Sequence, residues 1–156
     1  SRDQTIPFFE TTTPRGYLGW GNSSQLGYGL GIAMGAKLGA PEKLVVNIMG
    51  DAAIGMAGMD IETAVRHNIP ILTIVLNNHV LSGYSRNYPV ATEKFGFTNL
   101  YGEYADLAKS LGAHSERIED PNEVIPGIKR AMESMKDGKP ALIEFMTSEE
   151  NNLSRY

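Results

Sequence analysis

Short apolar runs separated by helical patterns constrain the fold of this chain more than any other feature. The runs KLVVNIM, ILTIVL and ALIEFM are short and carry β-branched residues, so each predicts a buried strand, at 43–49, 71–76 and 141–146. A further strand is expected at 113–118. Apolar spacing and helix-ending residues predict the helices between them, at 25–39, 58–67, 101–111 and 121–135. This alternation predicts the α/β class, a three-layer sandwich with a mostly parallel sheet covered by helices on both faces.

The remaining segments are expected to be irregular. Residues 1–15 contain two prolines and no clear period, and residues 148–156 form a polar tail. A loop of about twenty residues, rich in Gly, Ser, Asn and Pro, is expected to follow from Asn77. With 156 residues, the whole chain, 1–156, is expected to form one domain.

Composition excludes several classes of function. The formal net charge is −4 and no dense Lys/Arg cluster occurs, which argues against nucleic acid or an anionic membrane surface as the main partner. The absence of cysteine excludes disulfides, thiolate metal sites and a cysteine nucleophile. No apolar run reaches the ~18 residues that a membrane span requires, and a cytoplasmic location is the expectation.

Two predicted strands run into polar residues where a parallel sheet would bind a ligand. KLVVNIM leads into Gly50-Asp51, and ILTIVL leads into Asn77-Asn78, with Asn78 27 residues after Asp51. Ligands of open parallel α/β sheets bind at the carboxyl ends of strands, so neighbouring strands would bring Asp51 and Asn78 together. A carboxylate, an amide carbonyl and a backbone carbonyl after Asn78 form a hard-oxygen set that suits Mg²⁺.

The small residues after Asp51 point to an anion beside that metal. A helix start offers backbone N–H groups that favour a phosphate, so metal and anion together imply a diphosphate held by Mg²⁺. Two simpler interpretations stay open from the residues alone. Asp51 could be a helix N-cap, and the Asn pair could be a turn.

This pattern resembles that of a known family. GDA at 50–52 followed by NN at 77–78 is similar to the thiamine-diphosphate-binding motif, usually written as GDG, a stretch of fewer than thirty residues, then NN. The stretch GNSSQLGYGLGIAMGAKLGAPEKLVVNIMGD resembles the acetolactate synthase-like branch, and the resemblance covers roughly residues 16–147. It implies the C-terminal diphosphate-binding domain of an enzyme that decarboxylates 2-oxo acids and, in some members, joins the product to an acceptor.

The resemblance also implies roles for individual residues. The Mg²⁺ ligands would be the side chains of Asp51 and Asn78 and the carbonyl of Val80. The backbone near the diphosphate would come from Gly50, Ala52 and Ala53, and Ala52 departs from the family's glycine.

Four other residues would also contact thiamine diphosphate. Leu26 would lie under the cofactor and keep it V-shaped, and the carbonyl of Ser24 would meet the cofactor's amino group. Leu81 and Ser82 would belong to a loop that closes over the diphosphate.

No segment here resembles the family's pyrimidine-binding domain, whose glutamate starts catalysis. The resemblance therefore implies a partner domain of the same enzyme from a second subunit, a homo-oligomer, and an isolated chain without activity. A simple 2-oxo acid decarboxylase and an oxalyl-CoA decarboxylase-like enzyme are alternatives, the latter because of GMAGMDIETAVRHNIP. A non-catalytic phosphate-binding α/β module is the alternative from a different class.

Overall fold

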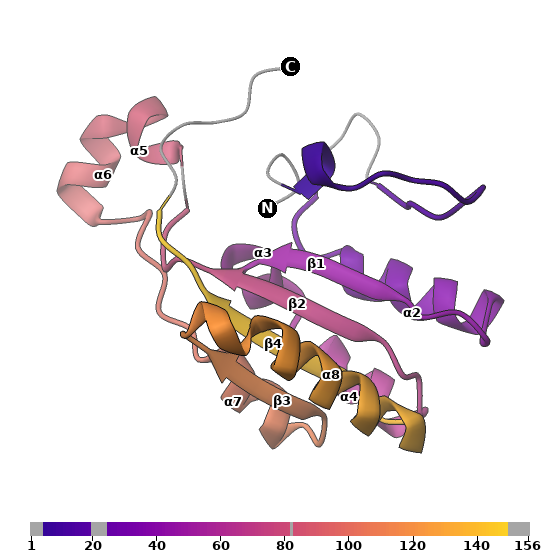
Figure 1. The fold of residues 1–156 in the computed structure, drawn as a ribbon. Helices are drawn as coiled ribbons and strands as arrows, with labels where there is room; N and C mark the ends of the chain where they lie inside the picture. Colours follow the sequence, from indigo (N-terminus) through magenta and orange to yellow (C-terminus); the bar gives the residue numbers. More distant parts are fainter. Residues whose placement is uncertain (1–4, 20–24, 82, 150–156) are drawn as a thin grey trace.

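The computed structural model describes residues 5–19, 25–81 and 83–149 (Figure 1). Its strands are β1 Val46–Gly50, β2 Leu72–Asn77, β3 His114–Ile118 and β4 Ala141–Met146. Its α-helices are α2 Gly29–Gly39, α3 Asp51–Ala57, α4 Asp60–Arg66, α5 Tyr84–Asn87, α6 Pro89–Phe95, α7 Tyr104–Ser110 and α8 Val124–Ser134. Short 3₁₀ turns are η1 Ile6–Phe8, η2 Pro121–Glu123 and η3 Met135–Asp137.

The four strands form one parallel sheet in the order β1-β2-β4-β3. Helical segments connect successive strands, as parallel pairing requires. All four carboxyl ends consequently lie along one edge of the sheet.

Helices cover the sheet from both sides, which confirms the predicted α/β architecture. Figure 1 shows α8 in front of the sheet and α2, α3, α4 and α7 behind it. The core behind the sheet includes Leu30, Ile54 and Val75, whereas the core under α8 includes Ala131 and Ile143. The two faces of the sheet thus contribute to two separate apolar cores.

Strand β1 is covered differently from its neighbours. Asn47 and Met49 are buried, and Asn47 lies against Gly29 of α2. Val46 and Ile48 point to the opposite face and remain 41% and 42% exposed. Among the described residues, α8 packs chiefly against β3 and β4 and leaves this face of β1 uncovered.

The first helix after β1 begins seven residues earlier than predicted. Helix α3 starts at Asp51 itself, and α4 follows after a break at Gly58-Met59. Ala53 and Ile54 are buried on its inner face, so the small residues serve helix packing. A Cβ on Gly58 would lie 2.9 Å from both the Ile54 carbonyl and the Leu107 side chain, which explains a glycine at the break.

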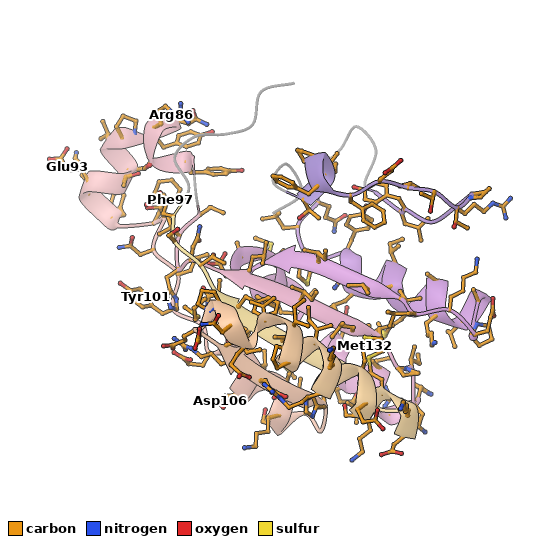
Figure 2. The ribbon with its side chains drawn as sticks, in the orientation of Figure 1. Arg86, Glu93, Phe97, Tyr101, Asp106 and Met132 are labelled. Atoms are coloured by element: carbon orange, nitrogen blue, oxygen red, sulfur yellow. The ribbon has the colours of Figure 1, made fainter. Side chains whose placement is uncertain are left out.

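The predicted loop after Asn77 is wrong where it contains α5 and α6. Pro89 starts α6 at a position where its missing N–H costs nothing, and Gly96, with φ 55°, ends the helix. Pro89 and Gly96 therefore mark the beginning and the end of helix α6 within the segment predicted as a loop. Figure 2 shows Arg86 on α5, Glu93 on α6 and Phe97 just after α6, in the part of the chain that projects from the sheet.

The other predicted elements are present, most of them with different ends. The predicted strand at 141–146 coincides with β4, while α2 starts at Gly29, β1 at Val46 and α7 at Tyr104. The predicted helix at 121–135 is divided into η2, α8 and the start of η3. No helix in the described ranges is long and apolar enough to cross a membrane.

Candidate functional site

Asp51 and the Asn pair meet at the carboxyl edge of the sheet, because β1 and β2 are parallel neighbours. Asp51 is the first residue of α3 and is only 5% exposed. Its Oδ1 accepts the backbone N–H of Ala52 at 2.8 Å, and its Oδ2 accepts the backbone N–H of Asn78 at 3.3 Å. One buried carboxylate thus connects the ends of two strands.

The Asn pair folds the chain into two successive side-chain turns. Asn77 Oδ1 accepts the N–H of His79 at 2.9 Å, and Asn78 Oδ1 accepts the N–H of Val80 at 3.0 Å. Asparagine favours such bonds to the backbone two residues ahead. His79, which belongs to both turns, has φ 60°, a left-handed conformation. Its Nδ1 is buried without a hydrogen-bond partner among the described residues. The turn interpretation of the pair is therefore present beside any ligand role.

A short antiparallel ladder holds the segment after this turn. Leu100 donates its N–H to the His79 carbonyl at 2.8 Å, and Leu81 donates its N–H to the Thr98 carbonyl at 2.8 Å. Val80 and Asn99 form an isolated antiparallel bridge between these bonds. The backbone of 79–81 is thus fixed against residues 98–100.

Glu144 is the polar residue that the sequence reasoning missed. Its side chain is fully buried in the middle of β4. Oε1 accepts the Asn77 Nδ2 at 2.6 Å, and Oε2 accepts the backbone N–H of Ala105 at 2.9 Å. A carboxylate inside the apolar run ALIEFM was the available signal, because a buried charge requires dedicated partners.

Negative charge gathers behind this edge. Burial raises the pKa of the Tyr104 hydroxyl, and the nearby carboxylates of Asp51 and Glu144 raise it further. The surroundings of Tyr104 therefore disfavour a further anion and would favour a cation.

The oxygen donors at Asp51 fit a hard metal ion. No group of three or more His, Cys, Asp or Glu side chains in the described ranges could hold a metal by itself. A metal at this edge would require amide and backbone oxygens beside the carboxylate. Mg²⁺ uses few protein carboxylates and takes its remaining ligands from water and phosphate.

The start of α3 accommodates alanine at position 52, where the family motif has glycine. Gly50, and not Asp51, occupies the N-cap position, so the N-cap interpretation of Asp51 is wrong. Ala52 lies within the helix and is not among the residues with positive φ, so its methyl causes no backbone strain. Ala53 is buried one residue further along.

The segment around Leu26 lies against the same helix. Gly27 has φ +94°, and a Cβ there would be 3.2 Å from the Ala53 carbonyl and 3.0 Å from the Ala57 methyl. Leu26 itself is half-buried against the core behind the sheet. Leu26, Gly27, Met56 and Ala57 line part of one surface pocket. Ser24 and Ser82, both predicted site residues, lie outside the described residues.

Comparison with known proteins identifies the family. Residues 3–145 match the family described as thiamine pyrophosphate enzyme, C-terminal TPP binding domain. This match covers nearly the whole chain and agrees with the resemblance of the GDA and NN segments.

The curated relatives are whole enzymes of which this chain matches one part. Sulfoacetaldehyde acetyltransferase of Alcaligenes xylosoxydans xylosoxydans is 33% identical over 140 residues, which cover 88% of this chain and 23% of that protein. Probable acetolactate synthase of Mycobacterium bovis is 33% identical over 133 residues, which cover 78% of this chain and 22% of that protein. Human 2-hydroxyacyl-CoA lyase 2 is 32% identical over 139 residues, which cover 85% of this chain and 22% of that protein.

A solved structure shares the fold. The thiamine diphosphate-dependent 4-hydroxybenzoylformate decarboxylase of Rhodococcus jostii RHA1 superposes with a TM-score of 0.70 at 23% identity, covering 81% of this chain and 24% of that one. The chain spans about a quarter of the length of this decarboxylase and of the curated relatives. The chain belongs to the thiamine pyrophosphate enzyme family and corresponds to its C-terminal TPP-binding domain.

Proposed function

We propose that this chain binds the diphosphate of thiamine diphosphate through Mg²⁺ at the carboxyl edge of β1 and β2. The observation that carries the proposal is the meeting of Asp51 with Asn78, joined by the bond from the Asn78 N–H to Asp51 Oδ2. Asp51, the Asn78 side-chain oxygen and the Val80 carbonyl would hold the metal. The set is made of hard oxygens from adjacent segments, as Mg²⁺ requires.

The diphosphate would lie beside the start of α3. Gly50, Ala52 and Ala53 would bring backbone close to it, and Leu81 and Ser82 would lie in the segment that covers it. Support comes from the backbone N–H groups in the first turn of α3, of which that of Ala52 also donates to Asp51 Oδ1, and from the metal proposed beside them.

The organic part of the cofactor would extend toward Leu26. Gly27 packs this segment against α3, which brings Leu26 close to the helix that starts at Asp51. Leu26 would support the bent cofactor, and Ser24 would offer its carbonyl to the amino group. When bound, thiamine diphosphate supplies an electron sink for 2-oxo acid chemistry, and this chain would bind it, orient it and screen it from water.

At the level of the whole enzyme, we propose an acetolactate synthase-like activity on 2-oxo acids. The support is the similarity to an acetolactate synthase and to an acetyltransferase over most of this chain. A pyrimidine-binding domain of the same enzyme, from a second subunit, would complete the site in a cytoplasmic homo-oligomer. The family match counts against the alternative of an unrelated phosphate-binding module.

Calorimetry on the full chain tests the binding proposal. Thiamine diphosphate is expected to bind in the presence of Mg²⁺ and not in the presence of EDTA. Asp51→Ala removes a metal ligand and is expected to abolish binding. Asp106→Ala is the matched control, because Asp106 is an exposed aspartate in the first turn of α7 (Figure 2). Binding without metal, or equal binding by Asp51→Ala and wild type, would contradict the proposal.

A turnover assay tests the partner-domain proposal separately. The chain alone, supplied with Mg²⁺ and thiamine diphosphate, is expected to leave pyruvate unchanged. Measurable turnover of pyruvate would show that this chain needs no second domain.

A further inference from the structure

We propose that Glu144 is a positioning residue that orients the Asn77 side chain and thereby sets the turn that presents Asn78. The proposal rests on the proposed function only in that Asn78 is taken as a metal ligand. Glu144 would touch neither metal nor cofactor. It would act through Asn77 alone.

The two oxygens of Glu144 bind two different segments. Oε1 accepts from Asn77 Nδ2 at 2.6 Å, and Oε2 accepts from the N–H of Ala105 at 2.9 Å, at the start of α7. The side chain is fully buried, so water does not replace either donor. A buried carboxylate persists only where such bonds satisfy it, and these two bonds therefore connect β2, β4 and α7 at one point.

A carboxylate only accepts hydrogen bonds, and this property decides which end of the Asn77 amide faces it. The Nδ2 must point toward Glu144, where it also donates to the Gly102 carbonyl at 3.2 Å. The Oδ1 consequently points the other way and accepts the His79 N–H at 2.9 Å. A reversed amide would place its NH₂ donor against the His79 N–H and its oxygen against the Glu144 carboxylate.

The orientation of Asn77 then reaches the proposed metal ligands. The bond to the His79 N–H bends the chain directly after β2, and His79 takes its left-handed conformation there. Within this bend the Asn78 N–H faces Asp51 Oδ2 at 3.3 Å. Partners that orient a ligand in this way commonly change metal affinity by about 10–100-fold when they are mutated.

The variant Glu144→Gln tests the inference with little change in shape. Glutamine has one accepting oxygen, so one of the two N–H donors must face its NH₂ group. We expect about tenfold weaker Mg²⁺-dependent binding of thiamine diphosphate in the full chain. We also expect faster amide hydrogen exchange at His79, measured by NMR without any metal.

Two further variants separate positioning from general destabilisation. Ile143→Val changes the neighbouring buried residue of β4, which packs in the core under α8, so it lowers stability and leaves cofactor affinity at the wild-type value. In Asn77→Asp with Glu144→Gln, the donor and acceptor are exchanged. The carboxylate introduced by Asn77→Asp would accept from both the glutamine NH₂ and the His79 N–H, although the Gly102 carbonyl loses its donor. The double variant is expected to bind more tightly than Asn77→Asp alone, in which two carboxylates would face each other.

Each outcome supports or overturns the positioning role. An amide exchange rate at His79 that is the same in Glu144→Gln as in wild type would overturn it. A loss of affinity in Ile143→Val equal to that in Glu144→Gln would overturn it as well. A double variant that binds no better than Asn77→Asp alone would also overturn it. If the wild-type chain shows no Mg²⁺-dependent binding, the proposed function fails, and His79 exchange still decides whether Glu144 sets the turn.

Discussion

The glycines of α2 allow a stability prediction within one helix. A Cβ on Gly29 would lie 2.6 Å from Asn47 Oδ1, whereas a Cβ on Gly35 would meet nothing within 4 Å. Gly29→Ala and Gly35→Ala therefore add the same methyl to the same helix. They differ in what the methyl meets, and we expect opposite effects on the free energy of unfolding.

The magnitudes follow from helix propensity and from packing. At the exposed Gly35, alanine removes the entropic penalty of a helical glycine and stabilises the fold by about 0.5–1 kcal/mol. At Gly29, an ordinary contact of 3.4 Å requires Asn47 Oδ1 to move by about 0.8 Å. Asn47 is buried and its Nδ2 donates to Met49 Sδ at 3.3 Å, so its movement disturbs the inner face of β1. Overpacking of this kind costs about 1–3 kcal/mol, which exceeds the propensity gain.

Urea denaturation of wild type and both variants provides the assay, with midpoints compared at constant slope. The urea midpoint of Gly35→Ala is expected to be higher than that of wild type, and the midpoint of Gly29→Ala lower. At this chain length the same difference in stability separates their melting temperatures by several degrees. Equal stability of the two variants would show that Asn47 yields at no cost and would refute the packing argument. A loss of stability in Gly35→Ala would show that this side of α2 is not open.

Three other predictions concern the core and two titrating groups. Ile54→Ala removes a fully buried side chain and should lower the free energy of unfolding by about 2–5 kcal/mol in urea denaturation, whereas Ile125→Ala, at a 59% exposed position, should change it by no more than about 0.5 kcal/mol. The hydrogen bond and charge of Arg130 hold the pKa of Glu116 below its ordinary value of 4.5, so the resulting stability is present above pH 4.5 and is lost as pH falls through the folded-state pKa. Arg130→Ala should therefore lower stability most at neutral pH, with a smaller difference in acid and at high salt, and a pH-independent difference in unfolding curves would contradict this. Burial and the carboxylates of Asp51 and Glu144 raise the pKa of Tyr104 above 10.0, so its neutral form contributes stability below pH 10.0 that is lost as pH rises through the raised pKa. Tyr104→Phe should therefore lose less stability than wild type at alkaline pH in a pH series of thermal melts. An equal alkaline loss of stability in the variant and in wild type would refute this.

The sheet was predictable because its strands carry a local signal. Three apolar runs with β-branched residues correspond to β1, β2 and β4, and the bounds of β4 agree at both ends with the prediction. The meeting of Asp51 with Asn78 followed from the same reasoning. It requires only that consecutive parallel strands be neighbours, and β1 and β2 are.

The helices beside the site were harder to predict because their residues have two physical uses. Ala52 and Ala53 suggested close approach of a ligand, but alanine is also the best helix former, and α3 begins at once after Gly50. Pro89 and Gly96 suggested a loop, but proline suits the first turn of a helix and glycine its end. Local residue types alone do not separate these uses.

Glu144 could not be assigned from sequence because its partner lies 67 residues away along the chain. The contact depends on the placement of β4 beside β2, which follows from the sheet order and from no local pattern. The odd carboxylate in ALIEFM predicts that some buried partner exists. It does not predict that this partner is Asn77.

Structural and ligand roles for Asp51 are compatible, because a carboxylate offers about four lone-pair positions. Its two hydrogen bonds, from the N–H of Ala52 and the N–H of Asn78, use one position on each oxygen. The Asn78 side-chain oxygen likewise accepts a bond of the turn, from the Val80 N–H at 3.0 Å. The bonds from the Ala52 and Asn78 N–H groups therefore orient the two Asp51 oxygens and leave them capacity for a cation. For this reason the structural bonds at Asp51 do not argue against the proposed metal ligation.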